Sequence, residues 1–401
     1  MSFRTLKSLA ASAIGTVIFL TGVPGVAHAA VFVTMHQFGS VAADGAYPRA
    51  PMIQATDGNY YGVTHGGGLY NAGTVFQMTP AGVTTVLHHF DSVDGSGPTG
   101  LTELASGDFV GATYNGGANS SGVVFRLTKT GSFTVLHTLN GTTDGASVAA
   151  PLFVATNGVI YGATSFGATA NGTACGTVFS ITATNVFNIV HSFPDSTNGC
   201  SGKGTMLSGN TDAYLYGTAE GGGAYSQGVL YSIVPSTGVF TRLVSFGATS
   251  TAGKVPKDGL VQGPDHNLYG VTYGGGSLTC SYTSGCGTIF KYTLSSRALT
   301  TLFNFSDNNS SNASYGAYPH GPLVIGRDGL LHGVTEGGGY LAGVVYSVSL
   351  TGANYTASHY FVAPTGSNPL AGLIQGSSGL FYGSTSGGSG SSTYGTIFET
   401  P

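Results

Sequence analysis

Short apolar runs separated by glycine-rich turns recur along the whole chain. In one stretch the runs are PLVIG, LLHGVT, GVVYSVS and YTASHYF, at residues 322–326, 330–335, 343–349 and 355–361. Their β-branched and aromatic residues favour strands, and the apolar positions lack the i, i+3, i+4 spacing of a helix. Turns between runs contain Asp-Gly and Asn-Gly pairs, which accept the positive φ of tight hairpins. The pattern predicts four consecutive strands.

This unit occurs seven times, with the last copy shorter by one run. Its most regular mark is a Tyr-Gly dipeptide or a stand-in, followed by a Gly-rich break and a Gly-Thr/Val-aliphatic-aromatic block. The dipeptides are Tyr61-Gly62, Val110-Gly111, Tyr161-Gly162, Tyr216-Gly217, Tyr269-Gly270, His332-Gly333 and Tyr382-Gly383. The first and last glycines are 321 residues apart in six steps, about 53 per repeat, which is close to the length of a propeller blade. We therefore predict an all-β fold, a seven-bladed β-propeller of four-stranded blades.

The chain begins in the middle of this unit. VFVTMHQF, at residues 31–38, resembles the fourth run of each repeat, such as VTTVLHHF at 83–90, and the last repeat has only three runs. We expect residues 31–38 to pair with residues 395–399 and to complete the last blade. The N-terminal strand would then close the ring and satisfy two sheet edges that would otherwise stay open.

Taken together, the segments G-x-L-Y-G-x-T-x-x-G-G, G-T-V-F and L-H-x-F resemble the GloVer-type tandem repeat of secreted bacterial proteins. The resemblance covers nearly all of residues 31–400. It implies a β-propeller and, in some members of this choice-of-anchor group, a variable C-terminal surface anchor. This chain departs from the anchored members because it ends at Pro401 without a sorting tail. The resemblance supplies no catalytic residues.

The N-terminus has the pattern of an export signal. Two basic residues precede the apolar run 10–20, and Ala-His-Ala at 27–29 provides a small-x-small cleavage pattern. The apolar run is short for a membrane span. We therefore predict a signal peptide over residues 1–29 and a single propeller domain over residues 30–401, with no membrane span after cleavage. The product would be secreted, either periplasmic or extracellular.

Charge is scarce, at 7% of the chain. After residue 29 there are 10 basic and 16 acidic residues, a net charge of −6. Nucleic acid is not an expected partner, because phosphate binding requires clustered Lys and Arg. The GGG segments are not followed by helices, so they do not form phosphate cradles. No haem or flavin motif is present in the sequence, and we expect no cofactor.

Four cysteines in an exported chain indicate disulfides, and four allow three pairings. Cys280 and Cys286 share one short loop and form the safest pair. Cys175 would then pair with Cys200, which follows it in the same repeat. A metal site is disfavoured because no histidine lies beside these cysteines at zinc-ligand spacing.

Residues that repeat are expected to serve the blade, whereas residues that break the repeat on the loop face are better functional candidates. The repeated histidines are therefore expected to be structural: His36, His88, His137, His191 and His359. The position after the Thr of Y-G-x-T varies from blade to blade. It is occupied by His65, Tyr114, Ser165, Glu220, Tyr273, Glu336 and Ser386, which could surround the central opening. Each of these could equally be a solvated polar residue beside a glycine.

Several chemistries are open to this set. Glu220 and Glu336 could act as the acid and base of glycoside cleavage, with His65 in proton transfer. Tyr114 and Tyr273 could stack on sugar rings. Arg49 and His320, in the loops between blades, could meet a uronate carboxylate.

The scarcity of ionisable groups and the uniform repeats favour a secreted, non-catalytic binding module for an extracellular or envelope ligand, either a glycan or a protein. The alternative is an extracellular carbohydrate-active enzyme, a polysaccharide lyase or a glycoside hydrolase, with its site on the loop face. A rigid spacer in a surface assembly is a third possibility. We expect the protein to be a monomer.

Overall fold

A computed structural model provides the structure of the chain. It describes residues 31–41, 43–167, 175–194, 196–209, 212–249, 251–276, 280, 285–307, 315–338, 342–362, 365–388 and 394–401. The predicted signal peptide lies outside the described residues. Residues 32–401 form one compact unit.

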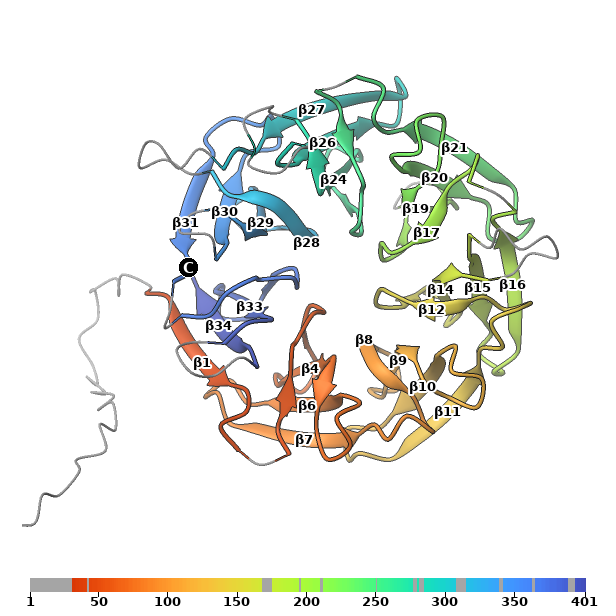
Figure 1. The fold of residues 1–401 in the computed structure, drawn as a ribbon, viewed down its shortest axis with the longest axis vertical. Coiled ribbons are helices and arrows are strands. Elements are labelled where there is room, and N and C mark those ends of the chain that lie inside the picture. Colours follow the sequence, from red (N-terminus) through yellow and green to blue (C-terminus); the bar gives the residue numbers. More distant parts are fainter. Residues whose placement is uncertain are drawn as a thin grey trace, which may run out of the picture. The chain divides into compact units, whose positions relative to one another are not determined.

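Seven antiparallel four-stranded blades stand around a common centre, which confirms the seven-bladed β-propeller (Figure 1). The innermost strands are β3 (Ile53–Gln54), β8 (Ser96–Glu103), β13 (Phe153–Val154), β18 (Leu207–Ser208), β23 (Val261–Gln262), β28 (Ala317–Ile325) and β32 (Ile374–Gln375). The second strands are β4 (Tyr60–Thr64), β9 (Phe109–Asn115), β14 (Ile160–Phe166), β19 (Leu215–Gly221), β24 (Leu268–Thr272), β29 (Leu331–Gly337) and β33 (Phe381–Thr385).

The outer half of each blade follows the same order. The third strands are β6 (Thr74–Met78), β10 (Val123–Leu127), β15 (Thr177–Ile181), β20 (Val229–Ile233), β26 (Thr288–Thr293), β30 (Val344–Val348) and β34 (Thr396–Thr400). The outermost strands are β7 (Thr84–His89), β11 (Phe133–Thr138), β16 (Phe187–Ser192), β21 (Phe240–Ser245), β27 (Ala298–Asn304), β31 (Thr356–Tyr360) and β1 (Val33–Gln37). Six short strands lie in the connecting loops: β2 (Gly45–Ala46), β5 (Gly66–Gly67), β12 (Ala146–Val148), β17 (Cys200–Gly202), β22 (Gly253–Lys254) and β25 (Gly274–Gly275).

The N-terminal segment provides the outermost strand of the seventh blade. β1 pairs antiparallel with β34, with Val33 opposite Glu399 and Gln37 opposite Thr396. The order of this sheet is β1-β34-β33-β32, so both ends of the propeller belong to one blade. The expectation that residues 31–38 complete the last blade is confirmed. Hydrogen bonds between the two ends of the chain therefore hold the ring closed.

The Tyr-Gly repeat has a steric cause. In each blade its glycine lies against the aromatic ring of the third strand. A Cβ added to Gly62 would lie 2.5 Å from Cζ of Phe76, and one added to Gly270 would lie 2.6 Å from Cζ of Phe290. Both rings are almost fully buried. Because a close-packed interior cannot absorb such an overlap without shifting, the glycine and the aromatic residue form one packing unit.

Histidines on the outermost strands join neighbouring blades. They stack on a phenylalanine of the next blade with ring centroids 3.5–4.8 Å apart, in the pairs His88–Phe133, His137–Phe187, His191–Phe240 and His359–Phe32. Three of the histidines also contact a loop aspartate at 2.7–2.9 Å, in the pairs His36–Asp44, His88–Asp94 and His137–Asp144. The structural role expected of the repeated histidines is confirmed by these contacts.

The loop face is the face formed by the second-to-third-strand loops and the blade-to-blade segments. One residue of each blade-to-blade segment has a left-handed backbone, with φ between 54° and 65°: Tyr47, Gly97, Ser147, Ser201, Val255, Tyr318 and Asn368. Each donates its N–H to a loop carbonyl of the preceding blade over 2.7–3.1 Å. These seven hydrogen bonds fix the path of each blade-to-blade segment. The residues that come next in each segment surround the centre of the propeller.

Two disulfides, Cys175–Cys200 and Cys280–Cys286, tie down loops. Both predicted pairs are confirmed. Disulfides persist in oxidising compartments, so the protein belongs outside the cytoplasm. Within the described residues, no helix is long and apolar enough to cross a membrane.

Candidate functional site

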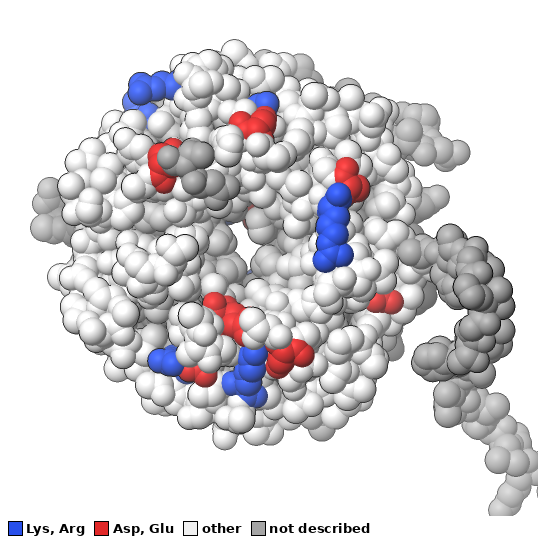
Figure 2. Space-filling view, turned by 180° about the vertical axis from the view of Figure 1, so that it is seen from behind, with Lys and Arg blue, Asp and Glu red and all other residues white. Residues whose placement is uncertain are grey.

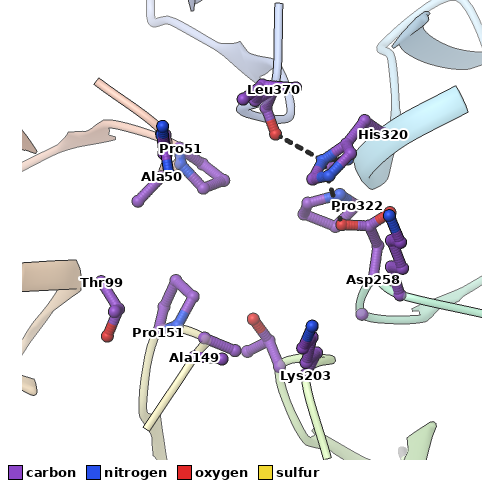
Figure 3. Close-up of a pocket in the computed structure, with 16 residues that line it drawn as sticks. Ala50, Pro51, Thr99, Ala149, Pro151, Lys203, Asp258, His320, Pro322 and Leu370 are labelled. Atoms are coloured by element: carbon purple, nitrogen blue, oxygen red, sulfur yellow. Dashed lines mark hydrogen bonds and ion pairs between the residues drawn. The ribbon is translucent and has the colours of Figure 1, made fainter. Parts of the chain in front are cut away.

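The centre of the loop face is a hollow to which every blade contributes. In each blade the left-handed residue is followed by one residue, proline in five blades, and then by a residue that lines the hollow. These seven positions, which we call the inner ring, are Arg49, Thr99, Ala149, Lys203, Lys257, His320 and Leu370. Figure 3 labels five of them: Thr99, Ala149, Lys203, His320 and Leu370. The proline fixes its own φ and holds the segment in one path.

The central hollow has two connected parts. The part lined by His65 and Tyr114 has a volume of about 440 Å³, and the part lined by Pro51, Pro151 and Pro322 has a volume of about 170 Å³. The larger volume falls within the range of about 300–1,000 Å³ that is common for small-ligand sites. One face of the ring is drawn in Figure 2, with an opening at its centre and charged side chains in a few separate groups.

Basic residues converge on the hollow. Three of the ten Lys and Arg residues that follow residue 29 belong to the inner ring, together with His320. The Lys203 ammonium lies 2.7 Å from Glu220, and the Lys257 ammonium lies 3.4 Å from the centre of the Tyr273 ring. Arg49 is exposed and forms no ion pair with any described residue. Of the three inner-ring cations, the Arg49 guanidinium is therefore the one that no described side chain engages.

His65, Tyr114, Arg49 and His320 all line the hollow, so the structure brings these four sequence candidates together. Burial, followed by the charge of Arg49, lowers the pKa of His65 and favours its neutral form. A Cβ on Gly97 would lie 2.6 Å from the His65 ring, so the loop of the next blade packs closely against this imidazole.

The two glutamates occupy a different environment. Neither Glu220 nor Glu336 is among the residues that line the hollow. Glu220 is bound to Lys203, with the Ser201 hydroxyl 3.4 Å away. Burial, and then the charge and hydrogen bonding of Glu336, raise the pKa of Tyr273. Both carboxylates are therefore engaged by side chains of the loop face.

Tyr273 packs against three neighbouring side chains. Its ring stacks on Tyr318 with centroids 5.1 Å apart, and it meets His320 edge-on at 6.3 Å. With Lys257 over its face, the ring supports the wall of the hollow near His320. Among the described residues, Ser165 and Ser386 point their hydroxyls at backbone carbonyls of the neighbouring segments, Gly202 and Asn368.

Sequence reasoning missed Asp258, which also lines the hollow. The residue after the inner-ring position is glycine or alanine in the other six blades, namely Ala50, Gly100, Ala150, Gly204, Gly321 and Ala371. Asp258 Oδ1 lies 3.6 Å from His320 Nδ1, and its side chain is 11% exposed. Aligning the blade-to-blade segments would have revealed this exception, because an aspartate replaces a small residue.

Burial raises the pKa of Asp258, against the opposing influence of His320 and a Gly321 N–H. The Oδ2 atom is buried and has no hydrogen-bond partner within the described residues. A buried carboxyl oxygen without a partner is costly. This aspartate is thus the most unusual polar group at the site.

One cluster outside the hollow has the composition of a metal site. Cys280, Cys286 and Asp307 have potential ligand atoms within 4.8 Å of one another. The two sulfurs are joined in a disulfide, so neither is a thiolate ligand. The disulfide therefore accounts for the proximity of the two sulfurs, and Asp307 is the one remaining potential ligand of the cluster.

Solved structures share the fold at low sequence identity. The extracellular domain of a putative one-component system from B. thetaiotaomicron has a TM-score of 0.58 at 9% identity, over 91% of this chain and 39% of that one. A GH74 xyloglucanase from Xanthomonas campestris has a TM-score of 0.57 at 13% identity, over 88% and 53%. A putative 6-phosphogluconolactonase from Bacteroides uniformis has a TM-score of 0.51 at 14% identity, over 79% and 85%.

These likenesses establish the propeller architecture. The chain spans less than two thirds of the length of the first two of these proteins. No curated protein matches the chain. The sequence model of the Gloeobacter/Verrucomicrobia repeat matches residues 8–175 and 154–398. The matched residues include the Tyr-Gly marks of all seven blades, and the chain belongs to the Gloeobacter/Verrucomicrobia repeat family.

Proposed function

We propose that this chain is an extracellular binding module for an acidic glycan, and that the central hollow is its site. The observation that carries the proposal is the composition of the inner ring. Three of its seven positions hold Arg49, Lys203 and Lys257, in a chain with net negative charge and few cations. Cations gathered at one opening favour the binding of an anionic ligand.

Arg49 supports a carboxylate as the recognised group. The planar guanidinium binds carboxylates through two parallel hydrogen bonds, and no described acidic residue occupies it. Tyr114, which lines the same hollow, offers an aromatic face for a sugar ring. A uronate chain combines both features, because each unit carries one carboxylate and one apolar ring face.

Glycoside hydrolysis is less well supported. Hydrolases of this type require two carboxyl groups that flank the scissile bond. Glu220 is held by Lys203, and neither Glu220 nor Glu336 lines the hollow. The acidic glycan is therefore proposed as a ligand bound by cations rather than as a substrate of paired carboxylates.

The proposal is tested by calorimetric titration of the mature protein with uronate oligosaccharides and with neutral oligosaccharides of the same length. We expect binding of the uronates only, with an affinity that falls as salt is added. Arg49→Gln should weaken binding by about tenfold or more, since a charge-assisted contact is worth about 1.5–3 kcal/mol. Arg297→Gln makes the same chemical change in an exposed turn far from the inner ring and should leave affinity unchanged. Equal binding of neutral chains, or equal losses in the two variants, would contradict the proposal.

A further inference from the structure

Asp258 is an exception that the fold does not require. Six blades hold glycine or alanine at the equivalent position and form the same segment. The carboxyl is nearly buried, and its Oδ2 atom has no hydrogen-bond partner among the described residues. A buried and incompletely satisfied carboxyl destabilises the folded state. In a repeat protein, a destabilising departure from the repeat that lines a cavity points to a function of that side chain.

The group that Asp258 faces is His320. Nδ1 of His320 lies 2.8 Å from the carbonyl oxygen of Leu370, as the dashed line in Figure 3 marks. A carbonyl only accepts hydrogen bonds, so this contact assigns the proton to Nδ1. The Gly321 N–H lies farther from Nδ1, at 3.1 Å. It has a second acceptor in the Asp258 carboxylate, whose pKa it lowers, so Nδ1 is free to donate to the Leu370 carbonyl.

This tautomer leaves Nε2 with a lone pair. Nε2 of His320 forms no hydrogen bond with any described residue, and the ring lines both parts of the hollow. Asp258 Oδ1 is 3.6 Å from the protonated Nδ1 edge, where a carboxylate stabilises the imidazolium that forms when Nε2 takes up a proton. A base that is oriented through its other nitrogen is the usual arrangement of a catalytic histidine.

We propose that His320, oriented by the Leu370 carbonyl and Asp258, is the base of an eliminative cleavage of uronate chains bound in the central hollow. This inference rests on the proposed function and adds a reaction to it. Asp258 is a positioning residue, because it acts through His320. Arg49 and Lys203 supply the positive charge that binds the uronate carboxylate.

One imidazole can carry out both proton transfers of the reaction. Pairing of the carboxylate with cations makes the neighbouring C5 proton more acidic, because charge that develops on the carboxylate is stabilised. Nε2 removes this proton, the C5–H electron pair becomes the C4=C5 double bond, and the C4–O4 bond breaks. The imidazolium then returns the proton to O4 of the departing sugar. A single group can perform both transfers where C5–H and O4 lie on the same side of the ring, as in glucuronate and mannuronate units.

The chain offers matched variants for the test. His320→Gln removes the base and keeps a polar side chain, while Asp258→Ala restores the residue type of other blades. His266→Gln makes the histidine substitution in an exposed turn between the first two strands of the fifth blade. The mature protein and its variants are incubated separately with glucuronate, mannuronate, galacturonate and guluronate polymers. Ultraviolet absorbance of the unsaturated product and new reducing ends are recorded together, with binding and urea-unfolding midpoints measured in parallel.

We expect both signals for the unaltered protein and for His266→Gln. His320→Gln should lose at least about 100-fold in turnover, the usual contribution of a general base, and retain binding within about threefold. Asp258→Ala should lower kcat with KM little changed, and its urea midpoint should rise or stay the same.

Each of the following results would overturn the inference. Binding of uronate chains without any unsaturated product removes the reaction and leaves the proposed function intact. Turnover that survives His320→Gln, or that occurs only with galacturonate and guluronate units, excludes His320 as the single base and acid. A lower urea midpoint for Asp258→Ala would make Asp258 a structural residue. Failure of all uronate chains to bind would remove the proposed function as well.

Discussion

Replacing Phe38 by alanine tests how the propeller is closed. Phe38 follows β1, is fully buried, and meets Phe76 of the first blade edge-on with centroids 5.4 Å apart. Its N–H donates to the Gly395 carbonyl over 3.0 Å. The side chain thus anchors the N-terminal strand to the first blade, and the backbone anchors it to the seventh.

The expected magnitude follows from burial. Truncating a fully buried phenylalanine to alanine costs about 3–5 kcal/mol, because apolar burial is lost and a cavity remains. Phe90 is the equivalent residue after β7, with the same 0% exposure and the same 5.4 Å edge contact, in its case with Phe125. If β1 is a full member of the seventh blade, Phe38→Ala and Phe90→Ala should therefore cost about the same.

The free energy of unfolding is measured by urea denaturation, followed by tyrosine fluorescence and far-ultraviolet circular dichroism. Thr34→Ala, at an exposed position of β1, is the control and should change the free energy by less than about 0.5 kcal/mol. A loss below about 1 kcal/mol for Phe38→Ala, beside a full loss for Phe90→Ala, would refute closure by the N-terminal strand.

Two further changes test the packing. Burial lowers the pKa of His359 to about 4, below the value of about 6.5 in an unfolded chain, so the unfolded state binds more protons between these values. The free energy of unfolding should therefore be highest above a pH of about 6.5 and should fall as the pH drops towards 4. The loss should be less than about 3 kcal/mol, because the His359 ring is partly solvated. His359→Phe should flatten this pH dependence in urea titrations at several pH values, and an unchanged slope would contradict the lowered pKa of His359. Gly270→Ala should lower the free energy of unfolding by about 1–3 kcal/mol through overlap with Phe290. Gly221→Ala should change it little, because the atom nearest to the added Cβ would be 3.4 Å away. Thermal or urea unfolding compares the two, and equal effects would refute the steric reading of the Tyr-Gly repeat.

The fold could be predicted from sequence because its cause is periodic. Each blade needs a glycine beneath an aromatic ring, as Gly62 lies beneath Phe76, and this requirement marks every repeat. The N-terminal strand could be predicted because residues 31–38 match the fourth run that the last repeat lacks. The pairing of Cys280 with Cys286 followed from their proximity in the chain.

The site was only partly predictable. Periodicity identifies equivalent positions but does not indicate which of two loops reaches farther toward the centre. The left-handed residue and the proline that follows it bring the inner ring to the hollow, and the sequence candidates Arg49 and His320 lie on it. Glu220 looked available in sequence because the ion pair with Lys203 joins two loops whose approach depends on the folded blade. Asp258 does not stand out beside the Y-G-x-T repeat because it lies in the blade-to-blade segment, which carries no such regular mark.

The structure of the His320→Gln variant with a bound mannuronate oligosaccharide tests the central claim most directly, since this change should prevent cleavage during crystal growth. The account predicts a sugar ring in the central hollow, with a carboxylate within about 3 Å of the Arg49 guanidinium. A ligand bound on the outer strands or on the opposite face, with the hollow empty, would contradict it.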